Sequence, residues 1–160
     1  MSERIIAALD ASRLRIALLA ARFNEFVTTR LVAGAREELL RLGGRDEQIC
    51  EIHVPGSYEL PLAALHAARS GRYDAIVALG CLIRGQTPHF DYIAAHCARG
   101  LGQASLETGV PVSFGVLTAE TLEQAIDRAG GKFGNKGADA ARAAVEMANL
   151  LPRLGPPRDR

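Results

Sequence analysis

The sequence predicts an α/β fold in which a four-stranded parallel sheet carries helices on both faces. The first observation is that strand-like and helix-like patterns alternate four times, as they do in βαβ crossover units. The second is that the strand candidates are short apolar runs, typical of strands buried on both faces, of which Ala75–Leu79 is the clearest. The third is the length of 160 residues, which suits one domain burying roughly two-thirds of its unfolded surface. We therefore expect a single domain over residues 1–151.

A short segment precedes the sheet strands. Arg4–Leu9 has the composition of a strand, but Asp10-Ala11-Ser12 breaks the pattern before the next apolar run begins. A strand that is detached from the sheet order lacks a partner there. We therefore expect it to add to the sheet edge of a neighbouring subunit.

Four apolar runs are the expected strands of the sheet. Each is too short for a helix and ends at turn residues or where the apolar pattern stops. Pro111 interrupts only the start of the last run. The expected strands are Leu14–Ala20, Ile49–Val54, Asp74–Gly80 and Val110–Leu117.

Five segments have the apolar spacing of amphipathic helices. They are a helix capped by Thr28 or Thr29, then Leu62–Ala68, Asp91–Glu107, a helix that begins at Thr118 or Thr121, and Ala138–Leu151. Glycines end the first helix at Gly43-Gly44 and the third at Gly109.

Two further stretches are expected to lie outside regular structure. Gly130–Gly137 is rich in glycine but follows a helix and lacks the spacing of a nucleotide-binding loop, so it is interpreted as a connector. The tail Pro152–Arg160 is rich in proline and arginine and is expected to be poorly ordered.

Composition and cysteine spacing bear on several classes of partner. Apolar residues make up 48% of the chain, and the net charge of +1 comes without a basic run, so neither nucleic acid nor a membrane is expected as partner. Cys50, Cys81 and Cys97 are odd in number and widely spaced, which fits neither a disulfide framework nor a zinc site. With no secretory signal in the first residues, we expect a cytoplasmic protein that holds no metal.

The loop that follows Ala75–Leu79 carries the groups needed for chemistry on an anion. Ligands sit at the carboxyl ends of parallel strands, and this loop offers the cation of Arg84, backbone N–H groups freed by Gly85 and the hydroxyl of Thr87. His89 follows in the same loop, and an imidazole that titrates near neutrality is a natural proton shuttle.

Three other positions have a functional and an ordinary interpretation. Phe23, just beyond the first core strand, could stack on a flat heterocycle or merely cover the end of the core. Glu59 could accept hydrogen bonds from a polyol, or could be favoured by the dipole at a helix start. Arg128 could bind phosphate, or could be favoured by the dipole at a helix end.

Several ordered motifs resemble those of the 6,7-dimethyl-8-ribityllumazine synthase family. The most specific is the run Gly80–Tyr92, with Gly85-Gln86-Thr87-Pro88-His89 at its centre. The others are Arg22-Phe23-Asn24, the stretch 54–59, the stretch 111–118, the stretch 123–130 and Gly134-Asn135-Lys136-Gly137.

The resemblance implies a flavodoxin-like three-layer sandwich and an enzyme without metal or organic cofactor. The enzyme would be a transferase of riboflavin biosynthesis that condenses 5-amino-6-(D-ribitylamino)uracil with 3,4-dihydroxy-2-butanone 4-phosphate. It also implies His89 as the proton-transfer residue. The residues implied to hold ribitylaminouracil are Phe23, Asn24, Ser57, Tyr58, Glu59, Cys81, Leu82, Ile83, Phe114 and Lys136, and those implied to bind phosphate are Gln86, Thr87 and Arg128.

The resemblance further implies a homo-oligomer with shared active sites. Phe114, Arg128 and Lys136 would reach the site from a neighbouring subunit of a pentamer, and the short Gly130–Gly137 stretch resembles that of members forming shells of sixty subunits. Riboflavin synthase is a possible partner. Two alternatives stay open: a flavin- or lumazine-binding module without synthase activity, and a paralogue whose chief role is to form a shell. A phosphorelay receiver is disfavoured, because no phosphate-accepting aspartate ends Ala75–Leu79.

Overall fold

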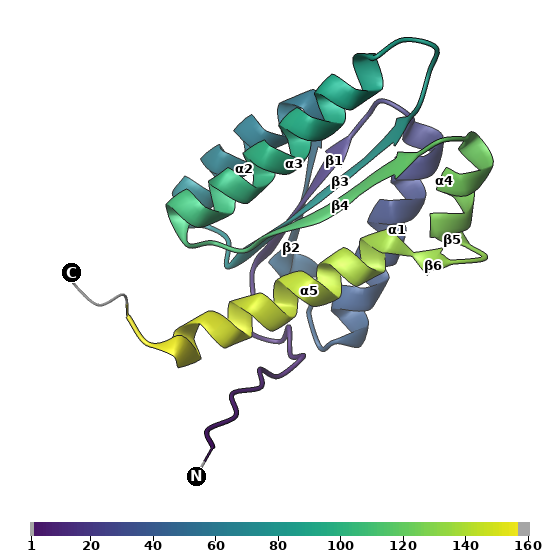
Figure 1. The fold of residues 1–160 in the computed structure, drawn as a ribbon. Helices are drawn as coiled ribbons and strands as arrows, with labels where there is room; N and C mark the ends of the chain where they lie inside the picture. Colours follow the sequence, from purple (N-terminus) through teal and green to yellow (C-terminus); the bar gives the residue numbers. More distant parts are fainter. Residues whose placement is uncertain (1, 157–160) are drawn as a thin grey trace.

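The computed structural model describes residues 2–156 and has three layers, with a parallel sheet between two layers of helices (Figure 1). The strands are β1 (Ile16–Ala21), β2 (Ile49–Val54), β3 (Ala75–Ile83) and β4 (Val112–Ala119), in the spatial order β2-β1-β3-β4. Every neighbouring pair is parallel. The predicted four-stranded parallel sheet is therefore confirmed.

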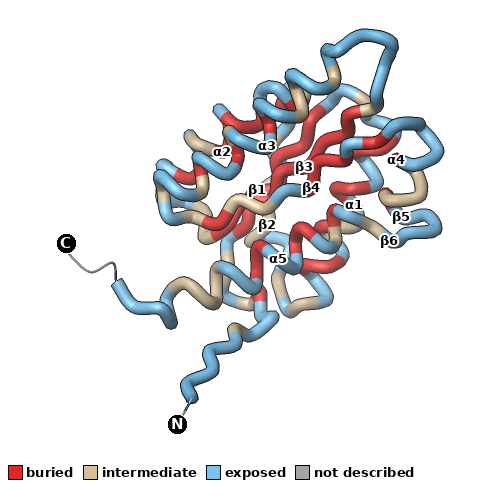
Figure 2. The backbone as a smooth tube through the Cα atoms, viewed as in Figure 1, coloured by how far each residue is buried: buried red, intermediate tan, exposed pale blue. Residues whose placement is uncertain are grey.

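The helices pack on both faces of this sheet. They are α1 (Glu25–Arg41), α2 (Leu60–Arg69), α3 (His89–Thr108), α4 (Leu122–Arg128) and α5 (Lys136–Leu150). Side chains alternate along each strand, so Leu18 and Val77 pack toward α1 and α5 while Leu19 and Ile76 pack toward α2 and α3. Figure 2 shows the buried residues along the strands and on the sheet-facing sides of the helices. Burial on both faces explains why β1 and β3 are continuous apolar runs.

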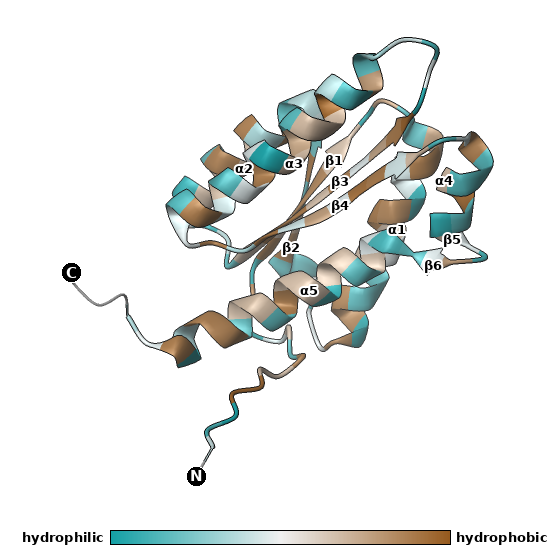
Figure 3. Cartoon of the chain, in the orientation of Figure 1, coloured by the Kyte–Doolittle hydropathy of each residue, from teal (hydrophilic) through white to brown (hydrophobic). Residues whose placement is uncertain are grey.

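Hydropathy follows the same layers. The strands are mostly brown or pale, and the helices carry alternating brown and teal bands, as amphipathic helices do (Figure 3). Among the described residues, no helix combines the length and the apolar character needed to cross a membrane.

Two element boundaries next to the predicted site differ from the expectations. Strand β3 does not end at Gly80 but continues through Ile83, because Cys81, Leu82 and Ile83 keep the apolar pattern. Helix α3 begins at His89 rather than Asp91, so His89 belongs to a helix start and not to a loop.

Helix α1 is not capped by Thr28 or Thr29. It begins at Glu25 after Asn24, whose backbone is left-handed with φ of 61°. Asparagine is one of the few residues that tolerate this conformation. The helix is therefore four or five residues longer at its start than a cap at Thr28 or Thr29 predicts.

The expected connector Gly130–Gly137 contains a small antiparallel hairpin, β5 (Ala129–Gly131) and β6 (Gly134–Asn135). Asn135 then caps α5, because its Oδ1 accepts from the backbone N–H groups of Gly137 and Ala138. Its Nδ2 donates to the carbonyl of Arg30 on α1 at 3.0 Å. A Cβ at Gly137 would lie 2.1 Å from the carbonyl oxygen of Leu31, so only glycine lets α5 start this close to α1.

The first described residues and the end of α5 lie on the same side of the domain (Figure 1). Arg4–Leu9 forms no strand within the described chain, and the amide of Asn149 donates to the carbonyls of Ala8 and Asp10 just beside it. The tail that was expected to be poorly ordered begins within a 3-10 turn, η3 (Leu151–Leu154). Residues 157–160 of that tail lie outside the described residues.

Candidate active site in two parts

A cavity of about 690 Å³ opens at the carboxyl ends of β1, β2 and β3, beside the start of α3. We call it the aromatic pocket because Phe23, Tyr58, Phe90 and Tyr92 line it. Ligand sites of α/β sheets commonly lie at this end of the strands. Nine of the predicted site residues line it: Phe23, Asn24, Ser57, Tyr58, Glu59, Leu82, Ile83, Thr87 and His89.

Phe23 and Asn24 form the wall that follows β1. The strained backbone of Asn24 is held from its side chain, since Nδ2 donates to the carbonyl of Cys81 at 2.8 Å. The backbone N–H of Phe23 donates to the carbonyl of Pro55 at 3.1 Å. These two contacts fix the backbone on which Phe23 lies. Phe23 itself is 69% exposed at the pocket, where a flat ligand can stack on its ring.

The wall that follows β2 is the 3-10 turn η2 (Ser57–Glu59). Ser57 is buried against β3, and a Cβ on Gly80 would lie 2.6 Å from its Oγ. This close approach explains a glycine inside a central strand. The Glu59 carboxylate folds back toward Gly56, so the turn presents one acidic group to the pocket.

Arg84 does not supply the free cation that the sequence suggested. Its guanidinium pairs with Asp91 at 3.1 Å and with Glu120 at 2.9 Å, and it lies 4.5 Å from the centre of the Phe90 ring. Hydrogen bonds from the guanidinium to Asp91 and Glu120 raise the pKa of Arg84. Its charge is already matched, so it fixes the loop between β3 and α3 instead of binding an anion.

A second cavity, of about 430 Å³, lies on the outer side of β4 beneath α4 and α5. We call it the cationic pocket because Arg128 and Lys136 line it, together with Phe114. The Nη1 of Arg128 donates to the carbonyl of Gln124 at 3.0 Å, and its guanidinium stacks 4.9 Å from the centre of the Phe133 ring. Within residues 2–156 Arg128 makes no ion pair, whereas Lys136 pairs with Asp139 at 3.1 Å.

No residue lines both pockets, and neither arginine nor lysine lines the aromatic pocket. The described residues also contain no cluster of three histidine, cysteine, aspartate or glutamate side chains arranged to hold a metal ion. One chain therefore holds a pocket lined by aromatic rings and, separately, a pocket lined by two basic side chains.

Comparison with known proteins identifies the family. The family model of 6,7-dimethyl-8-ribityllumazine synthase matches residues 13–152. The chain belongs to this family. Proteins with that name from Chlorobium chlorochromatii and Chlorobaculum tepidum are 55% and 54% identical to it, each over 95% of this chain and 98% of the relative. The one from Chlorobium phaeovibrioides is 54% identical over 92% of this chain and 96% of the relative.

Two residues implied by the lumazine synthase motifs lie outside both pocket linings. The Cys81 side chain packs in the core on the α1 face of the sheet, and burial raises the pKa of this thiol to about 11. Its carbonyl, which holds Asn24, is the part of Cys81 next to the site. Gln86 is exposed in the loop before α3 and lines neither cavity.

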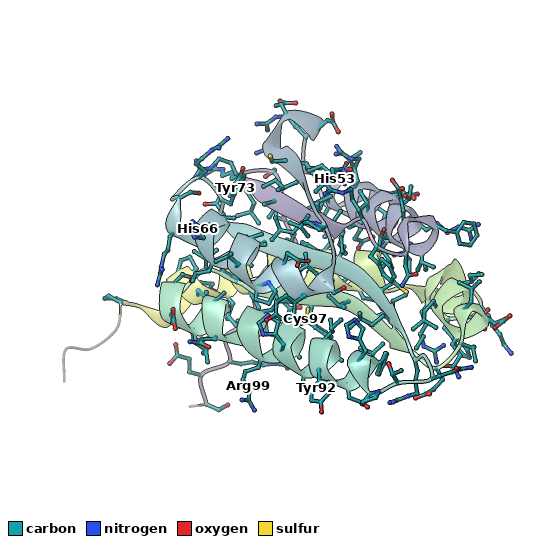
Figure 4. All side chains as sticks on the ribbon, turned by 90° about the horizontal axis from the view of Figure 1, so that it is seen from above. His53, His66, Tyr73, Tyr92, Cys97 and Arg99 are labelled. Carbon is teal, nitrogen blue, oxygen red and sulfur yellow. The ribbon has the colours of Figure 1, made fainter. Side chains whose placement is uncertain are left out.

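The structure adds residues to the two pockets that the sequence did not single out. Phe90, Tyr92 and Ile93 line the aromatic pocket because α3 starts at His89 and turns its first residues toward the cavity. Pro88 was the available signal, since proline favours the start of a helix. Figure 4 shows Tyr92 projecting from α3 while Cys97 lies on the side that faces the sheet. In the cationic pocket the addition is Asp139, three residues after Lys136.

Proposed function

We propose that this chain is a 6,7-dimethyl-8-ribityllumazine synthase that condenses 5-amino-6-(D-ribitylamino)uracil with 3,4-dihydroxy-2-butanone 4-phosphate. The observation that carries the proposal is the aromatic pocket, where residues from three separate motifs of that family line one cavity. Family membership over nearly the whole chain supports the same reaction.

The proposed roles follow from the chemistry of each side chain. Phe23 stacks on the pyrimidine, and the turn Ser57–Glu59 with Leu82 and Ile83 holds the ring and its ribityl chain. The 5-amino group of the pyrimidine attacks the ketone and one water leaves, and phosphate is then eliminated. The ribitylamino nitrogen attacks the remaining carbonyl group, and loss of a second water closes the ring to give the lumazine. His89 moves protons during these steps, and the protein otherwise supplies positioning and an anion site.

The phosphate of the second substrate needs a cation, and the aromatic pocket lining has none. We therefore propose that the cationic pocket of a neighbouring subunit faces the aromatic pocket, so that Arg128 meets the phosphate beside Gln86 and Thr87. Two facts support this arrangement: Arg128 has no ion pair among the described residues, and Phe114 is 47% exposed on the edge strand β4. Lys136 would approach from the same neighbouring subunit.

Subunit mixing tests the shared site. His89→Ala and Arg128→Ala variants, each weakly active alone, are unfolded together and refolded as mixed oligomers. Random association across a head-to-tail interface would place two intact halves together in about one quarter of the sites. Recovery of about that share of wild-type activity supports the proposal. Mixed oligomers no more active than the separate variants would show that each site lies within one chain.

We propose further that the subunits assemble into a shell of sixty rather than a free pentamer. The connection between α4 and α5 is short, and its hairpin is tied to α1 through Asn135. Arg4–Leu9 would add to a neighbour's sheet, and Ile6 and Leu9 are exposed for that contact. Light scattering and negative-stain microscopy at neutral pH decide between the two states, since uniform pentamers at all concentrations would contradict the shell.

Riboflavin synthase, which consumes the lumazine, is the partner we propose for the assembled enzyme, and the cytoplasm is its proposed location. The three thiols are free in the structure, which suits a reducing compartment. Co-purification with riboflavin synthase tests the partnership.

The decisive assay for the reaction mixes purified protein with both substrates in the presence of a chelator. We expect lumazine, followed by its absorbance, to form well above the spontaneous background. Folded protein that gives only the background rate would disprove the synthase function.

A further inference from the structure

His96 contacts the wall of the aromatic pocket from outside the cavity. It lies on α3, and its ring stacks on the ring of Tyr58 with centroids 4.2 Å apart and an interplanar angle of 23°. Its Nε2 lies 3.2 Å from the carbonyl oxygen of the same residue. His96 does not line the pocket itself. One side chain therefore holds both the ring and the backbone of a pocket residue.

The hydrogen bond fixes which ring nitrogen of His96 carries a proton. A carbonyl oxygen only accepts, so the proton of this bond must sit on Nε2 of His96. With Nε2 committed as donor and the ring face committed to the stack, rotation of the imidazole would break both contacts together. The pair therefore restrains Tyr58 more than either contact would alone.

Residues on either side of Tyr58 in sequence, Ser57 and Pro61, pack against other elements. Ser57 packs against β3, where a Cβ on Gly80 would come within 2.6 Å of its Oγ. Pro61, just after the turn, packs against α3, where a Cβ on Gly100 would come within 2.6 Å of Pro61 Cβ. Tyr58 lies between these two close packings and is 56% exposed. His96 supplies the stacking partner of the Tyr58 ring.

The geometry points to His96 as a positioning residue for the ribitylaminouracil side of the site. It holds Tyr58 and Glu59 in place and links them through α3 to His89, which lies two helical turns away on the same helix face. The inference rests on the proposed synthase function, because it assigns the turn to one of that enzyme's two substrates.

The test measures KM for each substrate separately. His96→Ala should raise KM for ribitylaminouracil about fivefold to tenfold, since one stack and one hydrogen bond are lost. KM for the phosphate substrate and kcat should each change less than about twofold, because those depend on other groups. His96→Phe, which keeps an aromatic ring but not the hydrogen bond, should restore part of the loss. His66→Ala is the matched control, an exposed histidine of α2 outside the pocket (Figure 4).

A double-mutant cycle separates action through Tyr58 from a general effect on folding. If His96 acts through Tyr58, then His96→Ala should add nothing to the KM of a Tyr58→Ala variant. Additive effects, equal changes for both substrates, or a fall in kcat alone would each overturn the inference.

A structural readout keeps the result independent of turnover. In crystal structures, Tyr58 should be stacked on His96 in the wild type and reoriented in His96→Ala. A Tyr58 ring that keeps its place in the variant would overturn the inference even if the enzyme is active. Wild-type protein that makes no lumazine would instead disprove the proposed function, while the position of the Tyr58 ring would still report the restraint.

Discussion

The two pockets of this chain are built in different ways from different chemistry. The aromatic pocket is made by the segments that follow three neighbouring strands, and its lining is rich in rings and poor in charge. The cationic pocket is made by the edge strand β4 together with residues of α4 and of the first turns of α5, and it carries two basic side chains. The difference matches the two proposed substrates, one a flat ring with a polyol and the other a small phosphate ester.

The same comparison explains why assembly is part of the proposed mechanism. Loops at strand ends can bring many residues of one chain together, as the aromatic pocket does. The cationic pocket instead lies on the edge strand β4, which is why we propose that it serves another copy of the chain. A substitution in one pocket should therefore change kcat or the KM of one substrate and leave the KM of the other substrate nearly unchanged.

The largest expected effect follows replacement of the proposed proton shuttle in the aromatic pocket. His89→Ala should lower kcat by about 10²-fold, at the low end of general acid–base contributions, because this condensation also proceeds slowly unaided. Both KM values should stay close to those of the wild type. Steady-state kinetics with His66→Ala as control checks this, and a variant that loses affinity while keeping kcat would show that His89 binds substrate instead.

Replacement of Arg128 in the cationic pocket comes next. Arg128→Ala should raise KM for the phosphate substrate by about 10- to 100-fold, the value of a charge-assisted hydrogen bond to phosphate. KM for ribitylaminouracil should hardly change. Lys132→Ala is the matched control, because Lys132 also stacks near Phe133 but does not line the pocket. Equal losses for both substrates would contradict the division between the pockets.

The sequence predicted the aromatic pocket better than the cationic one, for physical reasons. Parallel strands place their carboxyl ends at one edge of the sheet, so residues after β1, β2 and β3 had to lie near one another. Nothing comparable linked Arg128 to Lys136, since their approach depends on the hairpin between them. The two strands of that hairpin have three and two residues and no alternating apolar pattern, so they gave no strand signal.

Three predictions from the sequence differ from the structure, and they concern Gly80, Asn24 and Arg84. Gly80 was taken as the end of a strand, whereas it lies inside β3 to make room for Ser57. Asn24 was considered only for ligand binding, whereas its left-handed backbone also starts α1. Arg84 was interpreted as an anion ligand because its partner Glu120 lies 36 residues away in sequence, at the end of the neighbouring strand β4. Each miss needed a contact between segments that sequence spacing does not reveal.

The third prediction tests the packing on which the cationic pocket depends. Gly137→Ala should lower the free energy of unfolding by about 1–3 kcal/mol, because the new methyl group would overlap the Leu31 carbonyl. Gly102→Ala, at an open position of α3, should raise it by up to about 1 kcal/mol through helix propensity. Denaturant unfolding compares the two variants. If both stabilise the protein, α5 does not start against α1 as described.

The smallest expected effect concerns the ion pairs that join α1 and α5 deeper in the same layer. Glu38 is buried on α1, with its side chain 5% exposed, and its carboxylate accepts from Arg41 and from Arg142 of α5. Burial alone would raise the pKa of Glu38, but the hydrogen bonds from both arginines outweigh it and hold the pKa below its ordinary value. The carboxylate is therefore charged in the folded state at any pH where the enzyme is expected to work.

The sign of the pH dependence follows from that shift. A group whose folded pKa is lowered stabilises the protein fully above its unfolded pKa, about 4.5 here, and this contribution is lost as the pH falls through the folded pKa. Glu38→Gln should lower the free energy of unfolding by about 1–2 kcal/mol at pH 7, and the gap to the wild type should close as the pH drops below about 4.5. Glu37→Gln, an exposed neighbour without an ion pair among the described residues, should show no such gap. Unfolding curves from pH 3 to pH 7 measure both. A gap that stays constant with pH would mean that Glu38 contributes through packing rather than through its charge.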